Sequence, residues 1–291
     1  MLQPLLPTQW CNTKPILLLS TLLIAPAAPV WAEDDNLPRT IAATPYIASS
    51  RLPMQVFDTA QEMIQPETQP DPLHSSYPVP WNWVTTTYEE LRDSTDAQPR
   101  YYRTPPLISP DGLYAAYSRI QMQTRSDLHS SQVSSVMFLE NLKTGELKTI
   151  TASSPLAANY LEEDHQQLQS GAISILIPVS WSEQGDRLLA RQFEGLFSTS
   201  EASDYAVIWD RNTARTRTVA PTTIQYTNAV LLGWSSLYPQ QVLFRAGSLG
   251  ETEWPQWAVN LESETTLAKD DKPIVYGRFQ NPVWSGPQAK W

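Results

Sequence analysis

The sequence predicts an all-β protein built from a four-stranded antiparallel unit that is repeated along the chain. The first observation is the presence of 25 prolines against only 10 glycines in 291 residues, which disfavours long helices and the Gly-rich loops that bind phosphate groups. The second is a Ser-containing turn motif that recurs, each time followed by similar strand-like runs. Hydrophobic residues make up 41% and charged residues 17% of the chain, which is enough apolar material for a packed core.

The charge balance argues against one class of partner. The chain has 20 Lys and Arg against 30 Asp and Glu, a formal net charge of -10. Affinity for nucleic acid depends on clustered cations that displace counterions from phosphates. We therefore expect no nucleic-acid partner.

The first 32 residues have the pattern of a secretory signal peptide. Lys14 precedes an apolar run over residues 16–25, and small residues end at Ala32 before an acidic stretch. The run is shorter than the roughly 20 residues that span a bilayer; an uncleaved amphipathic anchor is the alternative. We expect cleavage near Ala32 and a periplasmic or secreted product without a membrane span. The only cysteine, Cys11, would leave with the leader.

Residues 33–98 are predicted to form a Pro-rich N-terminal arm or linker. Eight prolines lie between residues 38 and 80, and such spacing keeps regular structure short. Residues 33–77 are interpreted as the loosely attached part. Residues 81–92 are predicted to form one or two helical turns, whose aromatic side chains dock on the sheets.

The repeated turn motif divides the rest of the chain, residues 99–291. It occurs at residues 107–112, 179–186, 232–239 and 282–287. Its serines Ser182, Ser235 and Ser285 are 53 and 50 residues apart. The first interval is longer because of a polar insertion over residues 156–170, which is expected to be a surface loop.

Each of the first three motifs opens one copy of the unit. A strand-like run follows the turn, then a second run, a polar hairpin and a Thr-rich third run. The runs are residues 113–120, 135–139 and 146–151 in the first copy, 187–193, 204–209 and 215–219 in the second, and 241–246, 257–259 and 264–267 in the third. Each copy therefore predicts a four-stranded antiparallel meander.

The first copy carries a resemblance to a known family. The turn Ser109-Pro110-Asp111-Gly112, an alternating apolar strand and the hairpin Thr144-Gly145-Glu146 resemble the WD40-like repeat of the TolB-type β-propellers. The resemblance implies a β-propeller-like domain of about four antiparallel four-stranded blades. It also implies closure of the last blade by N-terminal strands, for which residues 46–58 or 83–88 are candidates. The alternative is a stack of antiparallel sheets that is not a propeller.

Catalytic and metal-binding patterns are weak. The densest acidic cluster, Glu162, Glu163, Asp164 and His165, lies in the predicted insertion, where a solvated loop is expected and an acidic site is the competing hypothesis. The three histidines lack the helical spacing of a zinc site. The recurring serines are interpreted as structural hydroxyls that cap turn amides, since no Gly-x-Ser-x-Gly motif is complete. We expect no cofactor and no metal.

Tryptophans supply the remaining candidates. Trp181, Trp234 and Trp284 occupy equivalent motif positions, which predicts packing between blades. Trp254 and Trp257 lie outside this pattern and are candidate contacts for a protein partner or a glycan.

The predicted function is that of an exported, non-enzymatic binding or scaffold protein of the bacterial envelope, with an envelope protein as the expected partner. The rival hypothesis is an envelope glycan hydrolase whose carboxylates, from different copies, converge in a central cleft. Two carboxylates that share one pocket and have displaced pKa values would favour the hydrolase.

Overall fold

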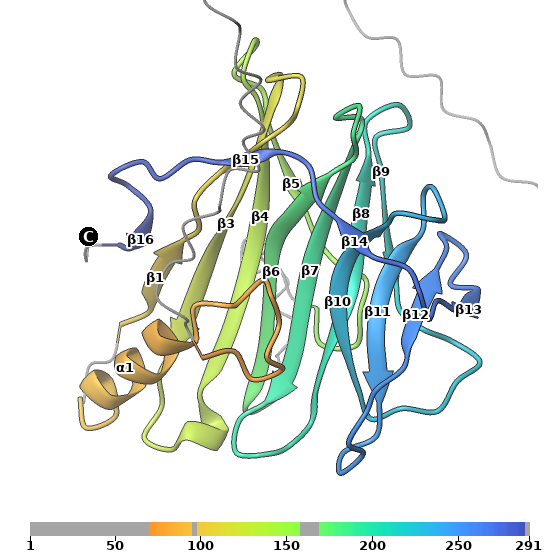
Figure 1. Cartoon of the computed structure of the whole chain (residues 1–291). Helices are drawn as coiled ribbons and strands as arrows, with labels where there is room; N and C mark the ends of the chain where they lie inside the picture. The colour runs from red at the N-terminus through yellow and green to blue at the C-terminus, as the bar shows by residue number, and fades with distance from the viewer. Residues whose placement is uncertain (1–69, 95–97, 158–168, 289–291) are drawn as a thin grey trace, which may run out of the picture. The chain divides into compact units, whose positions relative to one another are not determined.

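Three four-stranded meanders form most of the folded body (Figure 1). The computed structural model describes residues 70–94, 98–157 and 169–288, which belong to one compact unit. They contain 16 strands, one α-helix and a short 3-10 helix, η1 (Leu128–Ser130). The predicted β class is confirmed as a mostly β body with two sheets. The predicted leader, residues 1–32, and the acidic cluster at 162–165 lie outside the described residues.

Each meander corresponds to one predicted copy of the unit. The first contains β2 (Leu107–Ile108), β3 (Tyr114–Gln123), β4 (Gln132–Asn141) and β5 (Leu147–Ile150); the second contains β6 (Ala172–Trp181), β7 (Arg187–Leu196), β8 (Ala202–Asp210) and β9 (Arg215–Val219); the third contains β10 (Asn228–Ser235), β11 (Val242–Gly247), β12 (Gln256–Val259) and β13 (Thr265–Leu267). Within each meander, consecutive strands pair antiparallel. The repeat predicted from the turn motif is therefore confirmed for all three copies.

The meanders do not close into a ring. A parallel bridge between Val133 and Ile173 joins the first two into one 11-stranded sheet, whereas the third belongs to a separate five-stranded sheet. The described residues contain three meanders and no closed propeller, so the prediction of a ring of about four blades is wrong for this part of the chain. The reason lies in residues 282–287, which form a turn and a two-residue strand in place of a fourth blade.

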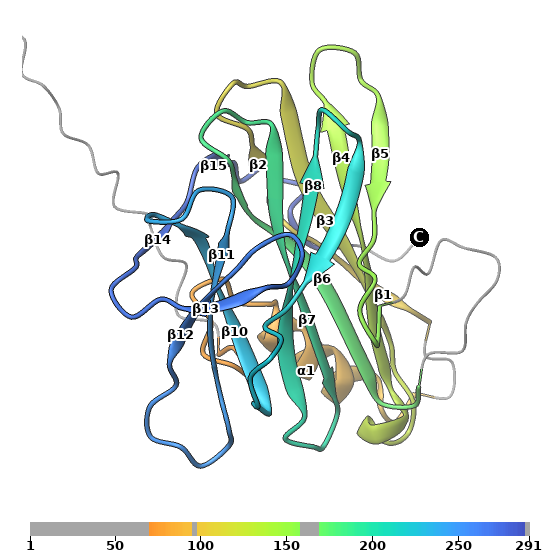
Figure 2. The ribbon, with the colours of Figure 1, turned by 90° about the vertical axis from the view of Figure 1, so that its right-hand side faces the viewer.

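The second meander is the middle layer, because strand alternation gives it two apolar faces. One face packs on the first meander in a cluster that includes Met137, Leu139, Leu176, Leu188 and Val207. The other packs on the third meander in a cluster that includes Leu189, Ile208, Leu231, Val242 and Phe244. Figure 2 shows the third meander lying beside the second. The core of the protein is therefore made mainly between meanders.

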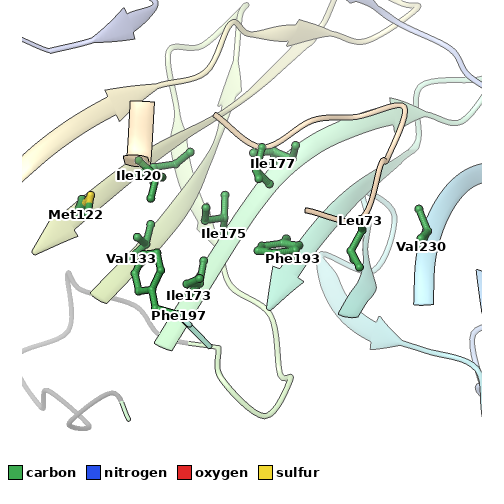
Figure 3. Packing of buried hydrophobic residues seen from close by; sticks show 12 residues of the cluster. Leu73, Ile120, Met122, Val133, Ile173, Ile175, Ile177, Phe193, Phe197 and Val230 are labelled. Atoms are coloured by element: carbon green, nitrogen blue, oxygen red, sulfur yellow. The ribbon is translucent and has the colours of Figure 1, made fainter. Parts of the chain in front are cut away.

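The N-terminal segment, residues 70–91, crosses one face of the body and packs on strands β3, β4, β6 and β7 (Figure 1). It ends in α1 (Trp81–Leu91), which begins directly after Pro78 and Pro80, residues that block a helix further upstream. Leu73, Val79 and Val84 are buried in one cluster with side chains of β3, β4, β6 and β7 (Figure 3). The predicted helix is confirmed and is longer than expected. The described end of the predicted arm is thus part of the packed body, and residues 83–88 are helical rather than a closing strand.

The C-terminal segment, residues 273–288, runs across the opposite end of the body, over the first strand of each meander. We call this segment the strap. It contains β14 (Pro273–Ile274), β15 (Arg278–Phe279) and β16 (Gly286–Pro287). These strands pair with β10, β2 and β1 (Arg100–Arg103), and Tyr276 bridges to Trp181. The strap thereby contacts the first strand of each meander, β2, β6 and β10, and ties the three meanders together (Figure 1).

Gly277 allows the strap to pass close over the second meander. Its φ is +101°, and a Cβ atom there would lie 2.9 Å from the carbonyl oxygen of Ile108 and from Cδ1 of Trp181. A side chain at this position would therefore meet both an unfavourable backbone conformation and a steric clash.

Candidate functional site

The recurring serines form the turns, which we call Ser corners. In the first corner, the Ser109 hydroxyl donates to Asp111 (2.6 Å) and accepts from the Tyr114 amide (2.9 Å). In the second, the Ser182 hydroxyl donates to Asp186 (2.6 Å) and accepts from the amides of Asp186 and Arg187. These hydroxyls are therefore used in capping turn amides, which confirms the structural interpretation for Ser109 and Ser182 but not for Ser285, whose buried hydroxyl has no hydrogen-bond partner among the described residues.

The third Ser corner uses a distant carboxylate in place of the missing Asp. The Ser235 hydroxyl donates to Asp271 (2.5 Å) and accepts from the amide of Tyr238. Asp271 also accepts from the backbone amides of Ser236 and Leu237. Partial burial raises the pKa of Asp271, but the hydroxyl and amide donors outweigh it and hold that pKa below its ordinary value.

One ion pair joins the corner of the first meander to the second meander, and another lies within the second meander. Arg211 donates to Asp111 (2.6 Å), and Arg187 donates to Asp210 (3.2 Å). Burial opposes ionisation of Asp111, but the Ser109 hydroxyl and Arg211 outweigh it, so the pKa of Asp111 lies below its ordinary value. These carboxylates are committed to turns and ion pairs.

Two carboxylates do converge, around the fully buried Arg191. Its Nε donates to Asp204 (2.7 Å), and its Nη1 donates to Asp71 (2.7 Å) and to the carbonyl oxygen of Tyr77 (2.6 Å). The side chains of Arg191, Asp71 and Asp204 are exposed by 0%, 2% and 0%. This buried triad carries one positive and two negative charges when ionised, a net charge of -1.

The surroundings push the two pKa values apart. Burial raises the pKa of Asp204 to about 6, against the opposing attraction of Arg191. Burial acts in the same direction on Asp71, but hydrogen bonds and charge from Arg191, with amides of Ser75 and Val79, hold its pKa below the ordinary value. Carboxylates with displaced pKa values are common in catalytic sites, but structural ion-pair networks displace pKa values as well. Here every partner is a protein group, and the near-zero exposure leaves a sugar no access to either carboxylate.

A second buried polar network lies between the first two meanders. Glu194 accepts hydrogen bonds from the Ser154 hydroxyl, the Leu156 amide (3.0 Å) and Gln192 (3.1 Å). Gln192 also donates to Ser174 (2.7 Å). Glu194 therefore anchors the loop that follows β5, which is a structural role.

The two tryptophans predicted to contact a partner are half-buried in the third meander. The Trp254 indole donates to the carbonyl oxygen of Ser248 (3.2 Å) and covers Gly247, where a Cβ atom would lie 2.5 Å from the ring. Trp257 lies on β12 and packs against the cluster between the second and third meanders. Both side chains are largely used in packing.

The motif tryptophans divide into two groups. Trp181 and Trp234 are buried, and the Trp181 indole donates to the carbonyl oxygen of Leu107 (3.2 Å), a contact between the first two meanders. Trp284 lies 38% exposed in a turn of the strap, so its predicted packing between blades is wrong.

Most of the exposed large apolar side chains in the described residues lie in two places. One is the Ser-corner end, where Leu113 and Leu142 stand side by side, because the Leu142 amide donates to the Leu113 carbonyl (2.8 Å). Leu237 and Tyr238 are exposed in the corner of the third meander. The other place is the strap, with Val275, Phe279, Val283 and Trp284.

Within ranges 70–94, 98–157 and 169–288, no three His, Cys, Asp or Glu side chains are grouped so that they could hold a metal ion. None of the helices in that part of the chain has the length and apolar character needed to cross a bilayer.

Comparison with known proteins identifies no relative. The chain matches no protein-family model, and no curated protein is significantly similar to it. The function must therefore be argued from the residues of this chain.

Proposed function

We propose that the protein is an exported, non-enzymatic binding or scaffold protein of the bacterial envelope, built as an open relative of the TolB-type propellers. The leader-like residues 1–32 support export. The three Ser-corner meanders, packed face to face, support the architectural part of the proposal.

The observation that carries the binding role is the exposure of paired apolar side chains at the Ser-corner end. Leu113 is 42% and Leu142 is 45% exposed, and they are neighbours. Singly exposed leucines are ordinary, whereas contiguous exposed apolar patches mark surfaces that bind proteins. Leu237 and Tyr238 extend the same character to the third meander.

The rival hydrolase has less support from the described residues. Its requirement is two carboxylates in one accessible pocket, separated by about 5 to 10 Å. The converging pair, Asp71 and Asp204, is buried and bridged by Arg191. The remaining candidates at Glu162, Glu163, Asp164 and His165 lie outside the described residues, so the test must include them.

The experiment is affinity capture from envelope extract with the full chain and two variants. Leu142→Asp changes the corner pair, and Leu267→Asp is the matched control, because Leu267 is 58% exposed on the outer strand β13. We expect one stoichiometric protein to be retained by the wild type and the control and lost with Leu142→Asp.

A glycan array and a hydrolysis assay run beside the capture. Retention of polysaccharide that is cleaved, and that depends on Glu162 or Glu163, would overturn the proposal in favour of the hydrolase. Equal capture by all three chains would remove the Ser-corner end as the binding surface.

A further inference from the structure

The strap presents an apolar turn that the packing of the protein uses only in part, because one face of Trp284 packs on Tyr117 while Val283 is left exposed. The Ser285 amide donates to the Pro282 carbonyl (3.0 Å), which leaves Val283 and Trp284 at the tip. Val283 is fully exposed and Trp284 is 38% exposed. Turn tips favour Gly, Asn, Asp and Ser, so two adjacent large apolar residues need another explanation.

The turn is held firmly from beneath. The guanidinium of Arg103 stacks 3.6 Å from the ring centroid of Trp284 and 4.2 Å from that of Tyr117. The Gln288 side chain donates to the carbonyl oxygens of Trp284 and Gly286, both at 2.8 Å. Pairing of β16 with β1 fixes the following residues. The tip is therefore a preorganised projection.

The charge of this segment is opposite to that of the whole chain. The strap, residues 273–288, contains one cation, Arg278, and no Asp or Glu, and Lys272 directly precedes it. The chain as a whole has 30 acidic and 20 basic residues. A cationic segment on an acidic protein favours an anionic surface and orients the protein toward it.

The shape of the turn distinguishes an acidic protein from an anionic bilayer as the partner. A protein partner of matching shape would need a pocket for a fully exposed valine, and the adjoining Phe279, 47% exposed, lies on the same extended strap. A bilayer interface accepts a projecting apolar residue without a pocket. Trp is enriched at membrane interfaces, and Lys and Arg near the surface attract anionic lipid headgroups.

We infer that the strap turn docks the protein on an anionic phospholipid surface. Val283 and Trp284 enter the headgroup region, Phe279 follows them, and Lys272 and Arg278 face the lipid phosphates. This surface differs from the Leu113–Leu142 pair, so the inference stands apart from the proposed protein-binding role.

The test measures binding of the full chain to vesicles of phosphatidylglycerol and phosphatidylcholine, with pure phosphatidylcholine vesicles for comparison. We expect stronger binding to the anionic vesicles, weakened by high salt. Val283→Asp should lower binding at least about tenfold, because burial of a valine alone is worth about that factor. Leu249→Asp, an exposed residue between β11 and β12, is the control and should bind like the wild type.

A second measurement separates the turn from the leader-like residues 1–32. An environment-sensitive dye is attached at Val283→Cys in a Cys11→Ser chain, and in a control chain at Leu249→Cys. We expect a blue shift of the dye emission on anionic vesicles at position 283 and none at 249. No shift at 283, or equal shifts at both positions, would overturn the inference. Loss of protein capture with Leu142→Asp would leave this result unchanged.

Discussion

Removal of the Arg191 side chain is predicted to be the most damaging single change to the folded body. Arg191→Met fills the space but leaves two carboxylates, Asp71 and Asp204, buried without their cation. Asp71 keeps amide donors from Leu73 and Val79 at 3.0 and 3.1 Å. Asp204 keeps only the Leu231 amide (2.9 Å) among its backbone partners.

The expected loss in free energy of unfolding is about 3–5 kcal/mol, the typical result of removing one partner from a buried ion pair. That is a large share of the roughly 5–15 kcal/mol that stabilises an ordinary domain. Arg187→Met is the matched control. Its ion pair with Asp210 is 19% and 23% exposed, and pairs of this kind contribute about 0–1 kcal/mol.

The assay is equilibrium unfolding in urea, followed by tryptophan fluorescence. The double variant Arg191→Met, Asp204→Asn is expected to recover part of the loss, because one stranded charge is removed. If Arg191→Met cost no more than Arg187→Met, the buried triad would not stabilise the fold as argued above. A double variant less stable than Arg191→Met would contradict the stranded-charge explanation.

Three further predictions concern the same framework. The pKa of Asp204 in the folded state, about 6, exceeds the unfolded value of about 3.9, so this group adds stability as pH falls from about 7 towards 4. The wild type should therefore gain stability at pH 5 relative to Asp204→Asn. A difference in urea midpoints that stays constant with pH would contradict this. Gly277→Val should release the strap and speed tryptic cleavage after Arg278. Gly286→Val is the control and should speed cleavage less, because Gly286 has a similar φ of +98° but a Cβ atom there would meet no atom within 4 Å. Equal cleavage rates would exclude the steric argument. Ser182→Ala should lower the free energy of unfolding by about 1–2 kcal/mol, because two turn amides lose their acceptor; an unchanged urea midpoint would show that the hydroxyl is dispensable.

The tryptophans show what the repeat pattern could and could not predict. Trp254 and Trp257 break the repeat and are half-buried, the first bound to Ser248 and the second packed against the cluster between the second and third meanders; their role as partner contacts stays a prediction. Trp284 follows the repeat, which predicts packing between blades, yet it is 38% exposed on the strap. Only the cationic, acid-free composition of the last 20 residues could have drawn attention to that segment beforehand.

The amino-acid sequence was enough to predict the three meanders, the first two Ser corners and the helix that follows Pro80. These depend on alternation within a strand and on hydrogen bonds between residues close in the chain, such as Ser182 and Asp186, which are four positions apart. The tertiary structure alone decided that the ring stays open, that the strap spans the meanders and that Arg191 meets Asp71, 120 positions away. Residues far apart in the chain become partners only when the faces that carry them pack together, and the local sequence pattern does not specify that packing.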